Sequence, residues 1–179
     1  EIILREWKRG RPSYQSAFIT SRDSGVYELA DLKGRRIAFE DKGSTTGFLL
    51  PMAVLRGAGL EMVRLATPEQ EVPPGKVGYV FVGSEINIAA WSARKLVDAG
   101  AYSNRDWERR KRTPERYRKQ LRVFQLSDPL PRSVMVVRGG LAPGLRKALV
   151  EALLDIGGDS GAGKLRKDYY NIERYDDFD

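Results

Sequence analysis

Short apolar runs alternate with segments of helical spacing along most of the chain. Three runs, at residues 37–39, 77–82 and 97–102, are typical of buried strands. Apolar positions recur with helical spacing at residues 48–60 and 86–96. Strands that alternate with helices predict a parallel or mixed sheet with helices on both faces, so we expect the three runs to lie in one sheet.

The same alternation continues toward both ends of the chain. Residues 1–5 and 14–22 are predicted to be extended strands joined by a Gly- and Pro-containing turn. A short helical piece is expected at residues 26–32, a loop at 66–76, a turn at 127–131, and further strands at 61–65, 121–126 and 133–137. Residues 143–156 predict an amphipathic helix with leucines on one face.

A polar turn rich in hydroxyl groups follows the strand at residues 37–39. Gly43 is followed by Ser44, Thr45 and Thr46, and a helix is predicted directly afterwards. The N-terminus of a helix presents backbone N–H groups and partial positive charge, which suit a small oxyanion. One hydroxyl of this kind also serves as an ordinary helix N-cap. Both an anion site and a simple cap therefore stay open at this turn.

Two further turns are expected at the same edge of the sheet, because ligands of open α/β sheets bind beyond the carboxyl ends of the strands. The turn at residues 83–85 contributes Glu85. The turn at residues 102–105 contributes Ser103 and Arg105. Our hypothesis is that the strand order brings these three side chains beside the hydroxyl-rich turn.

Composition limits the chemistry that this site could perform. The chain has no Cys and no His, which removes thiolate nucleophiles, disulfides, the usual general base and the commonest metal ligand. We therefore expect no catalytic residues, no metal and no cofactor. An enzyme that uses a carboxylate pair such as Asp41 and Glu85 is the alternative from another class.

The net charge of +7 at pH 7 comes largely from residues 105–122, where acidic residues interleave with basic ones. No aromatic stacking platform for single-stranded nucleic acid accompanies them, so we interpret the segment as a solvated surface helix that contributes little to ligand binding. We expect no nucleic-acid partner. No apolar run of about 18 residues occurs, so no membrane-spanning segment is predicted.

Gly158, Gly163 and Lys164 match the spacing of a phosphate-binding loop. Leu165 stands where that motif requires Ser or Thr, and a helix rather than a strand is predicted before it. We therefore interpret residues 158–164 as a flexible loop after a helix.

Several of these stretches together resemble the phosphate/phosphite/phosphonate substrate-binding proteins of ABC importers. The resemblance rests on LADLKG at residues 29–34, GSTTGFLLP at residues 43–51, and stretches at residues 83–85, 97–101 and 129–138. It implies an α/β fold of the type II periplasmic binding protein kind, with a mixed sheet flanked by helices. It also implies that most of the N-terminal lobe is missing, with crossing strands at 1–22, the second, ligand-binding lobe at 23–103, and a return to the first lobe at 104–179.

The resemblance further implies that Ser44, Thr45 and Thr46 hold the phosphoryl oxygens of a small oxyanion. Glu85 stands where the family often has His; it could accept a hydrogen bond from a protonated oxygen or point to solvent. Arg105 and Ser133 stand where members that bind an amine have carboxylates, which favours an anion without a cationic tail.

The expected partner is a membrane permease, and the expected location is periplasmic or extracytoplasmic. The chain begins without Met, so we expect any signal peptide to have been removed or to lie outside the sequence. An extracytoplasmic sensing domain of a signalling receptor with the same fold is the alternative function.

Overall fold

The computed structural model describes residues 1–156 and 160–177, which form two compact units. The inserted unit comprises Gln15–Asp128, and the terminal unit combines Glu1–Tyr14 with Pro129–Asp179. This division differs from the predicted boundaries after residues 22 and 103, both of which lie inside the inserted unit. The reason is that the strands on either side of each boundary belong to one sheet.

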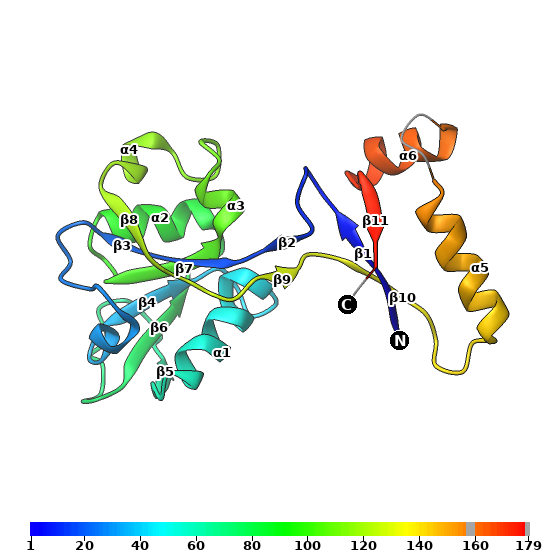
Figure 1. Ribbon diagram of the computed structural model, residues 1–179. Helices are drawn as coiled ribbons and strands as arrows, with labels where there is room; N and C mark the ends of the chain where they lie inside the picture. The colour runs from blue at the N-terminus through cyan, green and yellow to red at the C-terminus, as the bar shows by residue number, and fades with distance from the viewer. Residues whose placement is uncertain (157–159, 178–179) are drawn as a thin grey trace. The chain divides into compact units, whose positions relative to one another are not determined.

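The inserted unit is built on a six-stranded mixed sheet in the order β5-β6-β4-β7-β3-β8 (Figure 1). Its strands are β3 (Ser16–Ser21), β4 (Arg36–Phe39), β5 (Met62–Arg64), β6 (Val77–Phe81), β7 (Ala99–Ser103) and β8 (Leu121–Leu126). Strands β5, β6, β4 and β7 are parallel, and β3 is antiparallel to both of its neighbours. Strands β4, β6 and β7 overlap the three apolar runs, which confirms that these runs contribute strands to one sheet.

Helices cover both faces of this sheet. They are the 3₁₀ helix η1 (Leu29–Leu32), the π-helical turn η2 (Thr45–Leu49), α1 (Leu50–Gly57), α2 (Glu85–Ala93), α3 (Asn104–Trp107) and α4 (Glu115–Arg118). Side chains alternate across β4, so Ile37 and Phe39 pack in one cluster with Leu55 of α1, and Ala38 packs in the other with Ile88 of α2. Burial of both faces explains why the strand runs are almost wholly apolar.

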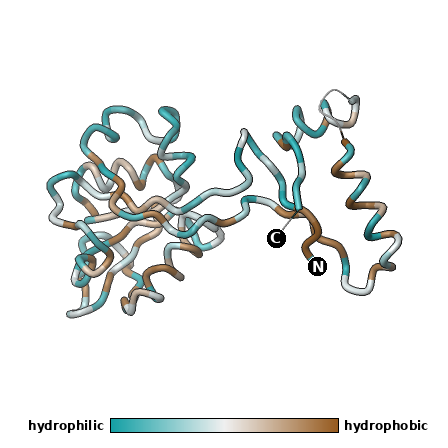
Figure 2. Tube along the Cα trace, in the orientation of Figure 1, coloured by the Kyte–Doolittle hydropathy of each residue, from teal (hydrophilic) through white to brown (hydrophobic). Residues whose placement is uncertain are grey.

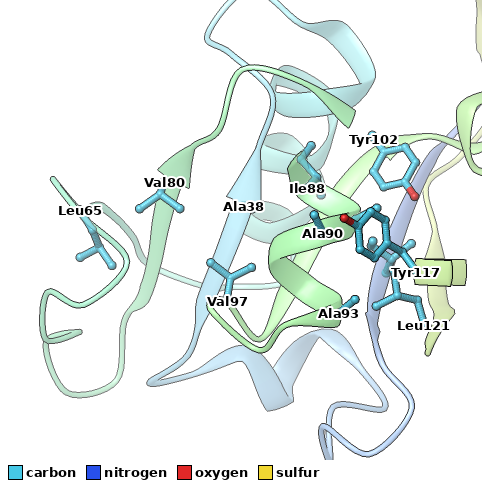
Figure 3. Close-up of a cluster of buried hydrophobic side chains, with 12 residues drawn as sticks. Ala38, Leu65, Val80, Ile88, Ala90, Ala93, Val97, Tyr102, Tyr117 and Leu121 are labelled. Carbon is cyan, nitrogen blue, oxygen red and sulfur yellow. The ribbon is translucent and has the colours of Figure 1, made fainter. Parts of the chain in front are cut away.

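The cluster beneath α2 shows how the core is filled (Figure 3). Leu65 and Val80 lie at one end, and Tyr102, Tyr117 and Leu121 gather at the other. A Cβ added to Gly100, in the middle of β7, would lie only 2.2 Å from Ile88 Cγ2. Glycine in β7 therefore allows α2 to approach the sheet closely.

The terminal unit contains a three-stranded sheet in the order β10-β1-β11 and a two-stranded sheet of β2 and β9. Its elements are β1 (Ile2–Trp7), β2 (Ser13–Tyr14), β9 (Leu130–Pro131), β10 (Val134–Val136), α5 (Pro143–Leu154), α6 (Gly161–Tyr170) and β11 (Arg174–Asp176). The turn predicted at residues 127–131 is wrong for β9, because Leu130 and Pro131 pair with β2. Hydrophobic positions recur along α5, as predicted, but none of its residues is buried (Figure 2).

The loop predicted at residues 158–164 is wrong for its second half. Gly158 lies outside the described residues, whereas Gly163 and Lys164 lie in the first turn of α6. The Ser160 side chain caps this helix by accepting a hydrogen bond from the backbone N–H of Gly163 at 2.9 Å.

The surface helix predicted at residues 105–122 is also wrong. The segment forms two short helices, α3 and α4, with a turn-rich stretch between them, and its last residues enter β8. Thr113 is fully buried and precedes Pro114, and the residue before a proline is disfavoured in helical conformation. Burial of Thr113 and the proline together interrupt the helix that the charged pattern favoured.

Candidate functional site

Ser44 is a helix cap in the turn between β4 and η2. Its hydroxyl oxygen accepts a hydrogen bond from the backbone N–H of Gly47 at 3.0 Å. The same hydroxyl donates its hydrogen to Glu40 Oε2 at 2.7 Å. A hydroxyl has one hydrogen to donate, so the capping role that the sequence left open describes Ser44 in this structure.

Thr45 and Thr46 are placed differently, as the first two residues of η2. Thr46 is 7% exposed and Thr45 is half-buried. Within residues 1–156 and 160–177, neither threonine hydroxyl has a hydrogen-bond partner. Because η2 continues directly into α1, both residues lie at the beginning of one longer helical segment, where backbone N–H groups have no intrahelical acceptor. The carbonyl oxygen of Thr46 accepts a hydrogen bond from Ser16 Oγ at 2.8 Å, which ties this turn to β3.

Gly47 allows the turn to close tightly. A Cβ at this position would lie 2.7 Å from Ser44 Oγ and 2.8 Å from both Cβ and Oε2 of Glu40. Any side chain at Gly47 would therefore displace the cap. The glycine maintains the contact between Ser44 and Glu40.

The turn between β6 and α2 packs directly on this first turn. The backbone N–H of Gly83 donates to the carbonyl oxygen of Glu40 at 2.9 Å. Ser84 caps α2 by accepting a hydrogen bond from the backbone N–H of Asn87 at 3.3 Å. Glu85 begins the helix, and only 14% of its side chain is exposed. Two of the three predicted turns are therefore in contact through the backbone.

The third turn, between β7 and α3, lies at the same edge because β7 pairs with β4. Ser103 caps α3 by accepting a hydrogen bond from the backbone N–H of Arg105 at 3.3 Å. Both of these residues are buried. Asn104 exchanges two hydrogen bonds with Gln15, at 3.0 and 3.2 Å, next to the Ser16 that reaches Thr46.

Electrostatics connect the three turns through Glu40. Burial raises the pKa of the Glu40 carboxyl above its ordinary value, and the nearby charges of Glu85, Asp41 and Asp106 add to this increase. The hydrogen bond from Ser44 opposes it. An acidic group thus lies beside the hydroxyl-rich helix N-terminus. Sequence reasoning missed Glu40 and Asp106. Glu40 directly follows β4 and Asp106 closely follows β7, and both strands end at this edge.

Arginines from the charged segment pair with two of these acids. Arg112 Nη1 lies 3.5 Å from Glu85 Oε2, and Arg109 Nη1 lies 3.6 Å from Asp106 Oδ1. The segment was expected to be a surface helix that contributes little to ligand binding. The pattern of charges along the segment did not indicate these ion pairs, because they depend on the loop that replaces the predicted helix.

The described part of the chain contains no cluster of three or more His, Cys, Asp or Glu side chains arranged to hold a metal ion. Among the described helices, none combines the length and the apolar character that crossing a membrane requires.

Comparison with known proteins gives a family match over the full chain. Residues 1–179 match the family of ABC transporter, phosphonate, periplasmic substrate-binding proteins, which are solute-binding proteins and not enzymes. XAC2383 from Xanthomonas citri, solved bound to chloride ion and bound to ATP, is 31% identical, with TM-scores of 0.87 and 0.88. PhnD1 from Prochlorococcus marinus, in complex with methylphosphonate, is 22% identical with a TM-score of 0.60 and shares the fold.

These matches cover nearly all of this chain but only part of each relative. The alignments with XAC2383 include 100% of this chain and 64% or 65% of that protein, and the alignment with PhnD1 includes 99% and 66%. Because the family match extends over every residue, the chain belongs to the family of periplasmic substrate-binding proteins of phosphonate ABC transporters.

Proposed function

We propose that the protein is the solute-binding component of an ABC importer for a phosphorus oxyanion: a phosphate, a phosphite or a phosphonate. The observation that carries the proposal is the pair of threonines, Thr45 and Thr46, at a helix N-terminus. Their hydroxyls make no hydrogen bond with any described residue. Family membership supports the same class of ligand. The partner that this function requires is a membrane permease, and the location is extracytoplasmic.

The chemistry of the site gives its three hydroxyl residues different roles. Thr45 and Thr46 donate hydrogen bonds to the oxygens of the anion, together with the backbone N–H groups of the first helical turn. Each hydrogen bond from a hydroxyl to a charged oxygen contributes roughly 1.5–3 kcal/mol. Ser44 instead holds the turn in place through Gly47 and Glu40. Its replacement should therefore act mainly on stability.

Affinity measurements on the purified protein test these roles. The probes are inorganic phosphate, phosphite, methylphosphonate and ATP, the last because the relative XAC2383 was solved with it. We expect Thr45→Val and Thr46→Val, which keep the side-chain shape, to weaken binding about tenfold or more. We expect Ser44→Ala to lower the free energy of unfolding by about 1 kcal/mol, the usual effect of losing a cap.

Two results would contradict the proposal. One is that the unaltered protein binds none of the four probes. The other is that both threonine variants bind as tightly as the unaltered protein. Loss of phosphonate uptake on deletion of the gene separates an importer component from a sensing domain of the same fold, which would leave uptake unchanged.

A further inference from the structure

The basic loop, residues 108–113, is held firmly at its base. Thr113 is fully buried, and its hydroxyl donates to the carbonyl oxygen of Asp106 at 2.9 Å. The Tyr102 hydroxyl lies 2.9 Å from the same Thr113 oxygen. The backbone N–H groups of Arg112 and Thr113 both donate to the carbonyl oxygen of Arg109, at 3.0 and 2.7 Å. These bonds fix the backbone from which the Arg112 side chain extends.

Two arginines of this loop lie against the acids of the site, and two basic neighbours do not. Arg109 pairs with Asp106 and Arg112 with Glu85, as described above. Arg110 and Lys111 are exposed and have no ion pair or hydrogen bond with any of the described residues. Four successive basic residues are thus divided by the fold into a pair that contacts the site and a pair that faces solvent.

Glu85 poses an electrostatic problem for a site that receives an anion. Only 14% of its side chain is exposed, so water screens its charge poorly. It is close enough to Glu40 to raise the pKa of that carboxyl. The same negative charge repels an incoming oxyanion unless a cation compensates it.

We propose that Arg112 is a ligand-binding residue, placed beside the site by Glu85. This inference rests on the proposed function, because it assigns a contact to the anion bound at Thr45 and Thr46. The Arg112 side chain is 52% exposed and contacts Glu85 through one nitrogen at 3.5 Å. A guanidinium has five N–H donors in a planar fork, so the contact with Glu85 leaves donors available to a ligand.

The pairing gives Arg112 two effects on binding. It compensates the charge of Glu85, which removes a repulsion, and it offers donors that match two oxygens of one phosphoryl or phosphonyl group. Arg109 is less suited to donate to a ligand. Its partner Asp106 lies within the same short segment, and the Arg109 side chain is less exposed than that of Arg112, at 34%. Arg112 thus extends a site built from helix N-termini with a cation from a separate loop.

The test compares Gln variants that each remove one positive charge from the same loop with Arg112→Lys, which keeps the charge. Affinity for inorganic phosphate and for methylphosphonate is measured by calorimetry on the purified protein at physiological salt. We expect Arg112→Gln to weaken binding about tenfold or more, and Arg112→Lys to recover only part of the loss. The matched controls Arg110→Gln and Lys111→Gln should change affinity by less than about twofold, because screening reduces the effect of exposed charges.

A second variant separates direct contact from a general effect of charge. In the Arg112→Gln background, Glu85→Gln should restore part of the affinity, because it removes the carboxylate that is left without its partner. Equal losses in the three Gln variants of the basic loop would overturn the inference, and so would the absence of any rescue. If the unaltered protein binds none of the four probes, the proposed function itself fails. If it binds and Arg112→Gln leaves the affinity unchanged, the inference alone fails.

Discussion

Glu40 has an unusual environment for a carboxyl group at the end of a strand. Burial disfavours its charged form and is the largest cause of its raised pKa. The folded protein therefore holds the proton of Glu40 more tightly than the unfolded chain does. Stability from this residue is fully present at pH values below the ordinary pKa of 4.5 and is lost as pH rises through the raised value.

We expect Glu40→Gln to raise the melting temperature at pH 7. Glutamine resembles the protonated acid, and its side-chain oxygen can still accept the hydrogen bond from Ser44. The difference from the unaltered protein should shrink as pH falls and vanish below about pH 4, where Glu40 is protonated in both states. Calorimetric melting between pH 3 and pH 8 checks this. The exposed Glu71→Gln serves as the control; an equal shift in both variants at pH 7 would contradict the prediction.

At the scale of elements, the buried strands of the inserted unit were the easiest to predict. Strand β4 carries Ile37 and Phe39 on one face and Ala38 on the other, and the sheet is covered on both faces. A run that is apolar on both faces gives a strong local signal. The strand order is a different matter, because β3 lies between β7 and β8 through pairings that no local pattern specifies.

The charged segment shows why local pattern failed elsewhere. Its alternating charges favour a solvated helix, but Thr113 is buried against Tyr102 and interrupts it. The candidate site divides in the same way. The hydroxyls of residues 44–46 could be found because they are consecutive, whereas Glu40 and Arg112 could not, because their place depends on which turns meet in three dimensions.

The base of the basic loop leads to a second stability prediction. Thr113 donates to Asp106, so the Tyr102 hydroxyl must donate to Thr113. Thr113→Val keeps the shape but leaves the buried Tyr102 hydroxyl without its acceptor, whereas the Asp106 carbonyl still accepts a hydrogen bond from the backbone N–H of Arg109 at 3.2 Å. We expect the free energy of unfolding to fall by about 1–3 kcal/mol, measured by urea denaturation.

Tyr102→Phe provides the matched test of this bond. In the Thr113→Val background, the additional loss caused by Tyr102→Phe should be smaller than in the unaltered protein, because the partner is already gone. Additive losses would mean that the hydrogen bond between the two hydroxyls contributes nothing to stability.

At the scale of the whole molecule, the inserted unit is one continuous segment with its own core. All six strands of its sheet and both buried hydrophobic clusters lie within Gln15–Asp128. We expect a fragment of these residues to fold alone and to unfold in a single cooperative urea transition, detected alike by far-UV circular dichroism and tryptophan fluorescence. Non-coincident transitions, or a fragment without cooperative unfolding, would contradict this expectation.

The terminal unit has the opposite construction, which affects the order of events during synthesis. Strand β1 leaves the ribosome before the inserted unit, yet both of its partners, β10 and β11, are made after it. The apolar side chains of Ile3 and Leu4 are buried in the folded protein. They remain without these partner strands while the inserted unit is synthesised and folds. The sheet around β1 therefore cannot be completed until β11, the last strand of the described residues, has been translated.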